Sequence, residues 1–96
     1  MTKVISGYVD VPPEDRPDFA RGLPEHSRLT NAEPGCQYFS VTPHSDIEGR
    51  YLVEEVFDDE AAYQAHGIRT RQTEWAQITR NINCLLYTSP SPRDRG

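Results

Sequence analysis

The sequence predicts an α+β domain in which strands and helices pack as two layers. The stretch Arg50–Phe57 alternates with period two, which predicts a strand, and an alanine-rich segment containing Ala61, Ala62 and Ala65 follows it at once and favours a helix. The segment Lys3–Val11 is rich in β-branched residues, which predicts a second strand. A length of 96 residues allows one domain with a modest core.

The first expected strand, Lys3–Val11, carries apolar residues on both of its alternating faces, as a central strand requires. Pro12 and Pro13 end it, because proline cannot donate a hydrogen bond to a neighbouring strand. An amphipathic helix should follow, since apolar positions recur at three- and four-residue spacing: Phe19, Leu23, His26, Leu29 or Thr30, and Ala32. Pro24 removes one backbone hydrogen bond of this helix, so we expect it to be bent or split into two pieces.

The next segments predict a hairpin and two further helices. Glu33-Pro34-Gly35 marks a turn, and Cys36–Thr42 resumes period two before a Pro-, Ser- and Gly-containing loop at 43–49. Such a loop joins antiparallel neighbours, here Cys36–Thr42 and Arg50–Phe57.

Two helices are expected after that hairpin. We expect Asp58 to cap the first of them, which ends near His66 and Gly67. Thr70 should cap the last helix, whose buried face is formed by Trp75, Ile78 and Ile82.

Composition narrows the range of partners. The formal net charge is −5 and the chain has a single lysine, which argues against nucleic acid or an anionic membrane surface as the partner. No apolar run approaches the ~20 residues of a membrane span, and no signal peptide is visible, so we expect a cytoplasmic protein. Cys36 and Cys84 are too few for a disulfide framework or a cysteine-based zinc site, and no metal is expected.

Residues 84–94 resemble the conceptual translation of a transposase-end sequencing adapter. We therefore expect residues 1–83 to form the domain and residues 84–96 to be a non-native tail that replaces the natural C-terminus. A natural Ser/Pro-rich disordered terminus would have a similar composition. Leu85, Leu86 and Tyr87 could imitate a strand by accident.

The predicted order is strand, helix, strand, strand, helix, helix, with a fourth strand expected after Asn83. This order is typical of a ferredoxin-like plait, here with its last strand replaced by the tail.

Three motifs at the predicted junctions resemble the antibiotic biosynthesis monooxygenase (ABM) family, the quinol monooxygenases. They are residues 33–36 (Glu-Pro-Gly-Cys) before a strand, residues 54–59 (Glu-Glu-Val-Phe-Asp-Asp) between strand and helix, and residues 65–75, which contain His66, Arg69 and Trp75. The resemblance covers about residues 4–82. It implies a homodimeric α/β barrel and oxygenation of a small phenol or quinol by O2 without metal, flavin or haem.

The haem-degrading branch of the same superfamily uses an asparagine on the first strand and a haem-ligating histidine on a helix. The first expected strand here has no asparagine, and no second histidine follows His66, so haem degradation is not expected.

Oxygenation without a cofactor needs a base that ionises the substrate hydroxyl and a pocket that excludes water. His66, near a helix end, is the favoured candidate, although a histidine there could also cap the helix or bind a backbone carbonyl. His26 is the second candidate, because it lies on the apolar stripe of the first helix and would point toward the sheet; a satisfied histidine at the core edge is its commoner role.

Four more residues are candidates for substrate binding. Arg69 could hold an anionic group with its fork of donors, although surface pairing with carboxylates would also explain it. Trp75, Tyr8 and Tyr51 could line a pocket for a flat ring or simply pack in the core. The predicted function is thus a cofactor-independent monooxygenase; the alternative is a non-catalytic dimeric barrel that binds a small molecule or acts in stress response.

Overall fold

The computed structural model describes residues 1–90 of the chain. Its elements follow in the order β1 (Lys3–Asp10), a 3₁₀ turn η1 (Pro13–Asp15), α1 (Arg16–Asn31), β2 (Cys36–Pro43), β3 (Arg50–Phe57), α2 (Glu60–Arg71), α3 (Glu74–Ile78) and β4 (Asn83–Pro90). The predicted ferredoxin-like α+β fold is confirmed.

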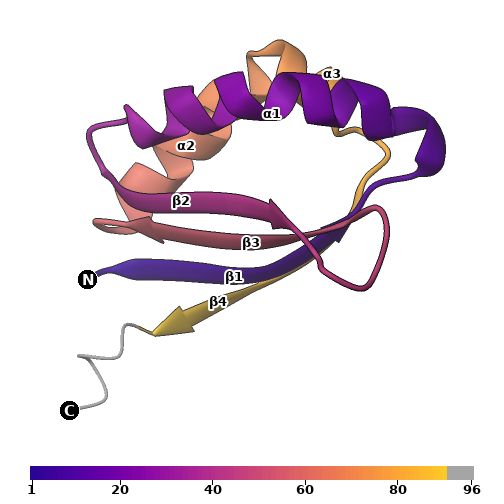
Figure 1. Cartoon of the computed structure of the whole chain (residues 1–96). Helices are drawn as coiled ribbons and strands as arrows, with labels where there is room; N and C mark the ends of the chain where they lie inside the picture. The colour runs from indigo at the N-terminus through magenta and orange to yellow at the C-terminus, as the bar shows by residue number, and fades with distance from the viewer. Residues whose placement is uncertain (91–96) are drawn as a thin grey trace.

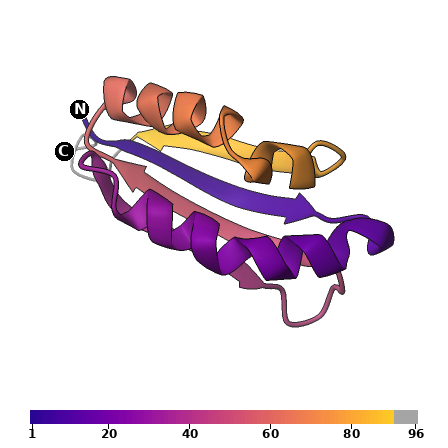
Figure 2. The same ribbon diagram turned by 90° about the horizontal axis from the view of Figure 1, so that it is seen from above.

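The four strands form one antiparallel sheet in the order β2-β3-β1-β4. Within residues 1–90, α1, α2 and α3 all cover one face of this sheet, and the other face carries no helix (Figures 1 and 2). Residues paired across antiparallel strands share a face. Ile5, Glu55 and Phe39 form one row on the helix-covered face, and Tyr8, Leu52 and Leu85 lie in register on the opposite face.

The core lies between the helix-covered face and the helices. Its fully packed centre consists of Val9, Val11, Phe19 and Val53. Leu23, Val41, Tyr51, Trp75, Ile78 and Ile82 are partly buried around it. The predicted buried positions of the first and last helices are confirmed with two corrections: Ala32 is exposed just after the end of α1, and Ile82 packs on the core from beyond the end of α3.

The expected break at Pro24 does not occur. α1 runs without interruption from Arg16 to Asn31 with Pro24 inside it. Pro24 and Ala20, whose carbonyl loses its usual partner, are both on the exposed side of the helix, where water can replace the missing bond. Phe19 and His26 are buried on either side of the proline, and their packing holds both halves to the sheet.

The expected boundaries after β3 need correction. The cap of α2 is Asp59 rather than Asp58, because the Asp59 side chain accepts from the Ala62 N–H at 2.8 Å. α2 also continues past Gly67 to Arg71, so Thr70 lies inside it rather than starting the next helix. A glycine within a helix costs only about 1 kcal/mol, which a buried neighbouring side chain such as His66 can offset.

A fourth strand is present, formed by residues of the predicted tail. β4 pairs with β1 along its whole length, from Asn83 opposite Asp10 to Pro90 opposite Lys3. Gly7 permits this approach, since a Cβ at that position would lie 2.1 Å from the carbonyl oxygen of Leu85. The adapter origin of the tail and the domain division at residue 83 stay predictions, and the part of the tail at 91–96 lies outside the described residues.

Two kinds of feature are absent from residues 1–90. None of their helices is long and apolar enough to cross a membrane. Over the same residues, no group of three or more His, Cys, Asp or Glu side chains is arranged to hold a metal ion.

Candidate active site

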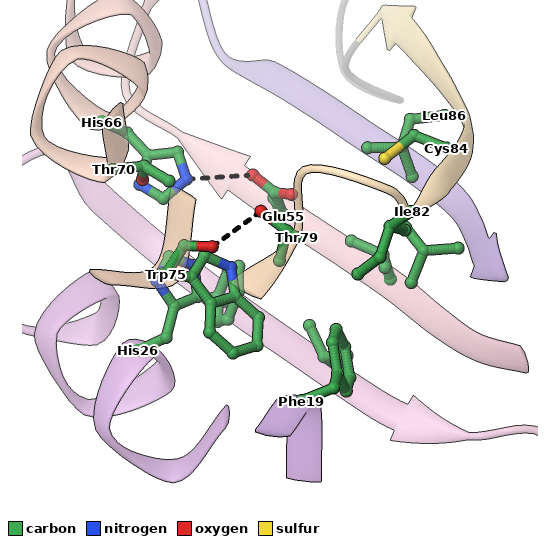
Figure 3. Close-up of a pocket in the computed structure, with 14 residues that line it drawn as sticks. Phe19, His26, Glu55, His66, Thr70, Trp75, Thr79, Ile82, Cys84 and Leu86 are labelled. Carbon is green, nitrogen blue, oxygen red and sulfur yellow. Dashed lines mark hydrogen bonds and ion pairs between the residues drawn. The ribbon is translucent and has the colours of Figure 1, made fainter. Parts of the chain in front are cut away.

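A cavity of about 170 Å³ lies between the sheet and the three helices (Figure 3). Its wall is mostly apolar and aromatic, with Phe39 and Val53 from the sheet and Trp75 from α3. The polar side chains that line it are His26, Glu55, His66, Thr70, Thr79 and Cys84. A cavity of this kind can receive a flat apolar molecule and offer it a few polar groups.

Glu55 is a buried carboxyl group in the middle of the sheet. Its place in β3 puts it on the helix-covered face between Ile5 and Phe39, and it is only 7% exposed. Its Oε1 atom has no hydrogen-bond partner. Burial and, to a smaller extent, the negative charge of Glu33 together raise the pKa of Glu55 to about 7. Glu55 is therefore largely protonated below neutral pH.

His66 points from α2 toward Glu55. Its Nδ1 lies 3.1 Å and 3.3 Å from the two carboxylate oxygens of Glu33, and its Nε2 lies 3.9 Å from Glu55 Oε1. Burial lowers the pKa of His66, and although Glu33 opposes this shift, the imidazole stays neutral. A carboxylate can only accept, so Nδ1 carries the proton and Nε2 keeps its lone pair. A neutral base thus faces a largely neutral acid.

A series of hydrogen bonds on the side of His66 away from the cavity holds Glu33 and the imidazole in place. Arg69 donates from Nε to the carboxylate of Glu33, and from Nη2 to Thr30 Oγ1 at 3.0 Å. Thr30 in turn donates to the backbone carbonyl of His26 at 2.8 Å. α1 and α2 are therefore tied together at the height of His66, and Glu33 is held where it can orient the imidazole.

His26 and Trp75 form one wall of the cavity as a stacked pair. Their ring centroids are 4.6 Å apart with an interplanar angle of 10°, and the edge of His26 also meets Phe39 at 5.5 Å. Burial lowers the pKa of His26 to about 3, with smaller contributions from His66 and Arg69. His26 is accordingly neutral at physiological pH and packs as an aromatic ring.

The family model for antibiotic biosynthesis monooxygenases (ABM) matches residues 4–77 of this chain. The chain belongs to the ABM family. No curated protein matches the sequence.

Several solved structures share the fold of this chain at low sequence identity. A protein from Bacteroides thetaiotaomicron assigned as an antibiotic biosynthesis monooxygenase superposes with a TM-score of 0.78 at 19% identity over 95% of this chain and 89% of that one. MupZ from Pseudomonas fluorescens gives 0.75 at 16% identity over 98% and 75% of the two chains. A Deinococcus radiodurans protein assigned to the same class gives 0.72 at 16% over 95% and 92%. These likenesses support the ABM fold.

Three of the six predicted site residues come together in this ABM protein. His66, His26 and Trp75 all line the cavity. Arg69 lies behind His66 in the contact with Glu33, and the cavity wall does not include it.

Neither predicted tyrosine lines the cavity. Tyr51 packs in the core against Phe19, with ring centroids 4.6 Å apart. Tyr8 lies on the helix-free face of the sheet beneath the guanidinium of Arg50, which is 3.8 Å from its ring centroid.

Sequence reasoning missed the two carboxyl groups of the site. The signal for Glu55 was available, because the alternation of β3 puts a glutamate on the same face as Val53 and Phe57, where an apolar residue is expected. Glu33 carried no comparable signal, since a glutamate before Pro-Gly is ordinary in a turn. Its role depends on a contact between positions 33 residues apart in the chain.

Proposed function

We propose that this ABM-family protein is a cofactor-independent monooxygenase that oxidises a small phenol- or quinol-type aromatic with O2. The observation that carries the proposal is the free Nε2 of His66 on the wall of an apolar cavity, with Nδ1 held by Glu33. This is the arrangement that a general base needs: an oriented imidazole, neutral at neutral pH, within reach of a bound hydroxyl group.

The first step is proton transfer from the substrate hydroxyl to His66 Nε2. The resulting phenolate is electron-rich and passes electrons to O2. For a simple phenol, one oxygen atom enters a ring carbon, and the other leaves as water with two hydrogens of the substrate. The products are a quinone and one water, and the substrate supplies all four electrons. The apolar wall keeps bulk water away from the intermediates.

The size of the cavity supports a small substrate. About 170 Å³ is below the ~300 Å³ at the low end of pockets for drug-sized ligands. An apolar cavity of roughly 150 Å³ is sufficient for benzene. We infer a small substrate of one ring or two fused rings, which lie against Trp75.

The three remaining candidates for substrate contact have different parts in this proposal. Arg69 acts through Glu33 and His66, because its guanidinium is engaged behind them. Tyr51 packs in the core against Phe19 and Tyr8 lies on the other face of the sheet, so neither contacts the substrate in this proposal.

We also propose that the protein is a homodimer that buries the helix-free face of its sheet. That face carries exposed apolar side chains from several strands, namely Tyr38, Leu52, Leu85 and Tyr87. A contiguous apolar patch of this kind is typical of an association surface. Covering it with a second sheet would give two layers of helices around two packed sheets.

Oxygen consumption tests the proposal. Purified protein is mixed with 1,4-dihydroxynaphthalene or menadiol, and uptake is followed with an oxygen electrode against the non-enzymatic rate. With ¹⁸O2, one labelled atom should appear in the product. His66→Ala should lower kcat by about 10²–10⁴-fold, the usual contribution of a general base.

The alternative is a binding protein without activity. Saturable binding of the aromatic without oxygen uptake above background would favour this alternative. Turnover by His66→Ala at the wild-type rate would remove His66 from the role of base.

A further inference from the structure

Glu55 and His66 face the same point on the cavity wall from two different elements. Glu55 projects from the sheet and His66 from α2, and both line the cavity (Figure 3). The 3.9 Å between Glu55 Oε1 and His66 Nε2 is too long for a direct hydrogen bond. Oε1 has no other partner, although it is buried. A buried polar atom without a partner, aimed into a cavity, indicates where a ligand atom belongs.

The protonation of the two groups defines what that ligand atom must be. At neutral pH a large share of Glu55 is a carboxylic acid, which donates, whereas the neutral His66 carries a lone pair on Nε2, which accepts. The other titratable or charged groups around Glu55 are His26 on α1, Glu33 after α1, Cys36 on β2, Arg69 on α2 and Cys84 on β4. Glu33 is paired with Arg69, and its charge still raises the pKa of Glu55. The matching group is therefore one that donates and accepts at a single atom, which is a hydroxyl.

The spacing suits one hydroxyl oxygen between the two groups. An oxygen about 2.8 Å from both atoms, the usual O–H···O distance, would make roughly a right angle with them. The carbon that bears this hydroxyl then points into the apolar part of the cavity, where Phe39, Val53 and Trp75 surround it.

We propose that Glu55 is a second catalytic residue: in its protonated form it donates a hydrogen bond to the same ring oxygen whose proton His66 Nε2 accepts. The proton moves from the hydroxyl to Nε2, and the phenolate oxygen keeps the hydrogen bond from Glu55 while the new imidazolium faces it. The site thereby selects a free phenolic hydroxyl over its methyl ether, which has no proton for Nε2. This inference rests on the proposed function for its substrate class.

Anaerobic binding tests the inference without turnover. The probe is 1-naphthol, titrated by its fluorescence in the absence of oxygen, with 1-methoxynaphthalene for comparison. Wild type should bind the naphthol more tightly than its ether. Glu55→Ala should weaken naphthol binding by about tenfold, as the loss of one buried hydrogen bond predicts. Glu55→Gln, whose amide still donates, should retain most of the affinity. Glu54→Gln, an exposed glutamate next in the same strand, is the matched control and should match wild type.

The pH dependence distinguishes a donor from a mere packing contact. Ordinary phenols ionise near pH ~10, so the probe stays neutral from pH 5 to about 9. Wild-type affinity should fall as the pH rises through 7, because ionised Glu55 can only accept. Glu55→Gln should show no such fall. Circular dichroism of each variant checks that it is folded.

Three results would overturn the inference: wild-type affinity in Glu55→Ala, an unchanged pH dependence in Glu55→Gln, or failure of 1-naphthol to bind the wild type. The proposed function fails separately. The predicted binding pattern without any oxygen uptake would refute the monooxygenase and leave the Glu55 contact standing. Equal oxygen uptake by wild type and Glu55→Ala would refute the role of Glu55 alone.

Discussion

The imidazole of His26 lies flat against the indole of Trp75, 4.6 Å away between ring centroids and 10° from parallel. The pair separates two hollows, because both rings line the cavity and also a groove between α1 and α3 that is bordered by Gly22, Leu29 and Ile78. Only these two stacked rings therefore separate the cavity from the groove on the outer surface of the helices.

Removing the His26 ring should open this wall. We expect His26→Ala to raise KM by about tenfold for a small phenol, because the ring that supports Trp75 is lost. kcat should change less than in His66→Ala. Larger aromatics that bind wild type poorly should become substrates.

His26→Phe is the matched control for that change. It restores a flat ring against Trp75, so KM should return to near the wild-type value. Steady-state kinetics on one-ring and two-ring phenols measures both variants. A loss of kcat in His26→Phe as large as that in His66→Ala would show that His26 acts in proton transfer.

The stability of the protein should depend on the protonation of His26. The pKa of His26 is about 3 in the folded state and 6.5 in the unfolded chain. Between these two pH values His26 is protonated in the unfolded chain and neutral in the folded protein. The free energy of unfolding must therefore fall as the pH is lowered from about 6.5 to 3, by up to a few kcal/mol. Glu55 acts in the opposite direction between about 7 and 4.5, because its folded pKa is the higher one.

Urea titrations at several pH values test this dependence. Below about pH 4.5 the contribution of Glu55 is complete, and the slope from His26 is most visible. His26→Phe should lose less stability than wild type between pH 4.5 and 3. Identical slopes for the two proteins would mean that His26 does not resist protonation in the fold.

Glu33 should matter for both stability and rate. In Glu33→Gln the guanidinium of Arg69 loses its charged partner, and a single amide oxygen is left to accept from both Arg69 Nε and His66 Nδ1. We expect the free energy of unfolding to fall by about 1–3 kcal/mol, the usual cost of leaving a buried polar partner unpaired. kcat should fall by about tenfold, as for other groups that orient a histidine.

Glu25→Gln is the surface control for Glu33→Gln. Glu25 pairs with Arg28 on an exposed turn of α1, so its loss should change stability by less than 1 kcal/mol, as exposed pairs usually do. Thermal unfolding and oxygen uptake measure both variants. Equal effects of the two substitutions would contradict a special role for Glu33.

Glu55 should lower the stability of the fold. Replacing it with leucine removes a buried carboxyl that has an unpartnered oxygen, so Glu55→Leu should raise the free energy of unfolding by about 1–3 kcal/mol. The gain should be larger at pH 8 than at pH 5, because the cost of burying Glu55 grows as it ionises on passing pH 7. Oxygen uptake should be lost at the same time. Chemical denaturation at both pH values measures the gain, and a less stable Glu55→Leu would contradict it.

The helix-free sheet face should determine the oligomeric state. Leu52 is 44% exposed on that face, and Leu52→Glu should convert a dimer into a monomer by placing a charge in the apolar contact. Ile68 on α2 is 51% exposed and makes a matched control, since Ile68→Glu should stay dimeric. Light scattering after size exclusion distinguishes the two. A monomeric wild type would refute the dimer directly.

The sequence was informative where one periodicity dominated. β3 was predicted to the residue because its alternation is unbroken from Arg50 to Phe57. Helix ends were harder to predict, since several residues competed for the same role. Asp58 and Asp59 are both good caps, and only the packing of the folded chain selects the second, leaving Asp58 to accept from Gln37.

Part of the site could be predicted for the same reason. His26 and Trp75 lie on apolar helical stripes, which identify the side that faces the sheet. The Glu33–His66 contact and the burial of Glu55 depend on how α2 crosses the sheet, and no local pattern encodes that crossing. Arg69 was predicted either to bind an anionic group of the substrate or to pair with surface carboxylates. The carboxylate that it contacts is that of Glu33, which lies in a turn distant in sequence and could not be identified from a local pattern.

One side of the cavity is formed by the C-terminal part of the described chain, whereas Glu55 and His66 come from earlier elements. Cys84 and Leu86 of β4 line that side together with Ile82, whereas Glu55 and His66 belong to β3 and α2. β4 is an edge strand, so grafting a different sequence onto it would reshape this side of the cavity and leave Glu55 and His66 unchanged. Substrate range and chemistry could then be tuned independently in this small domain.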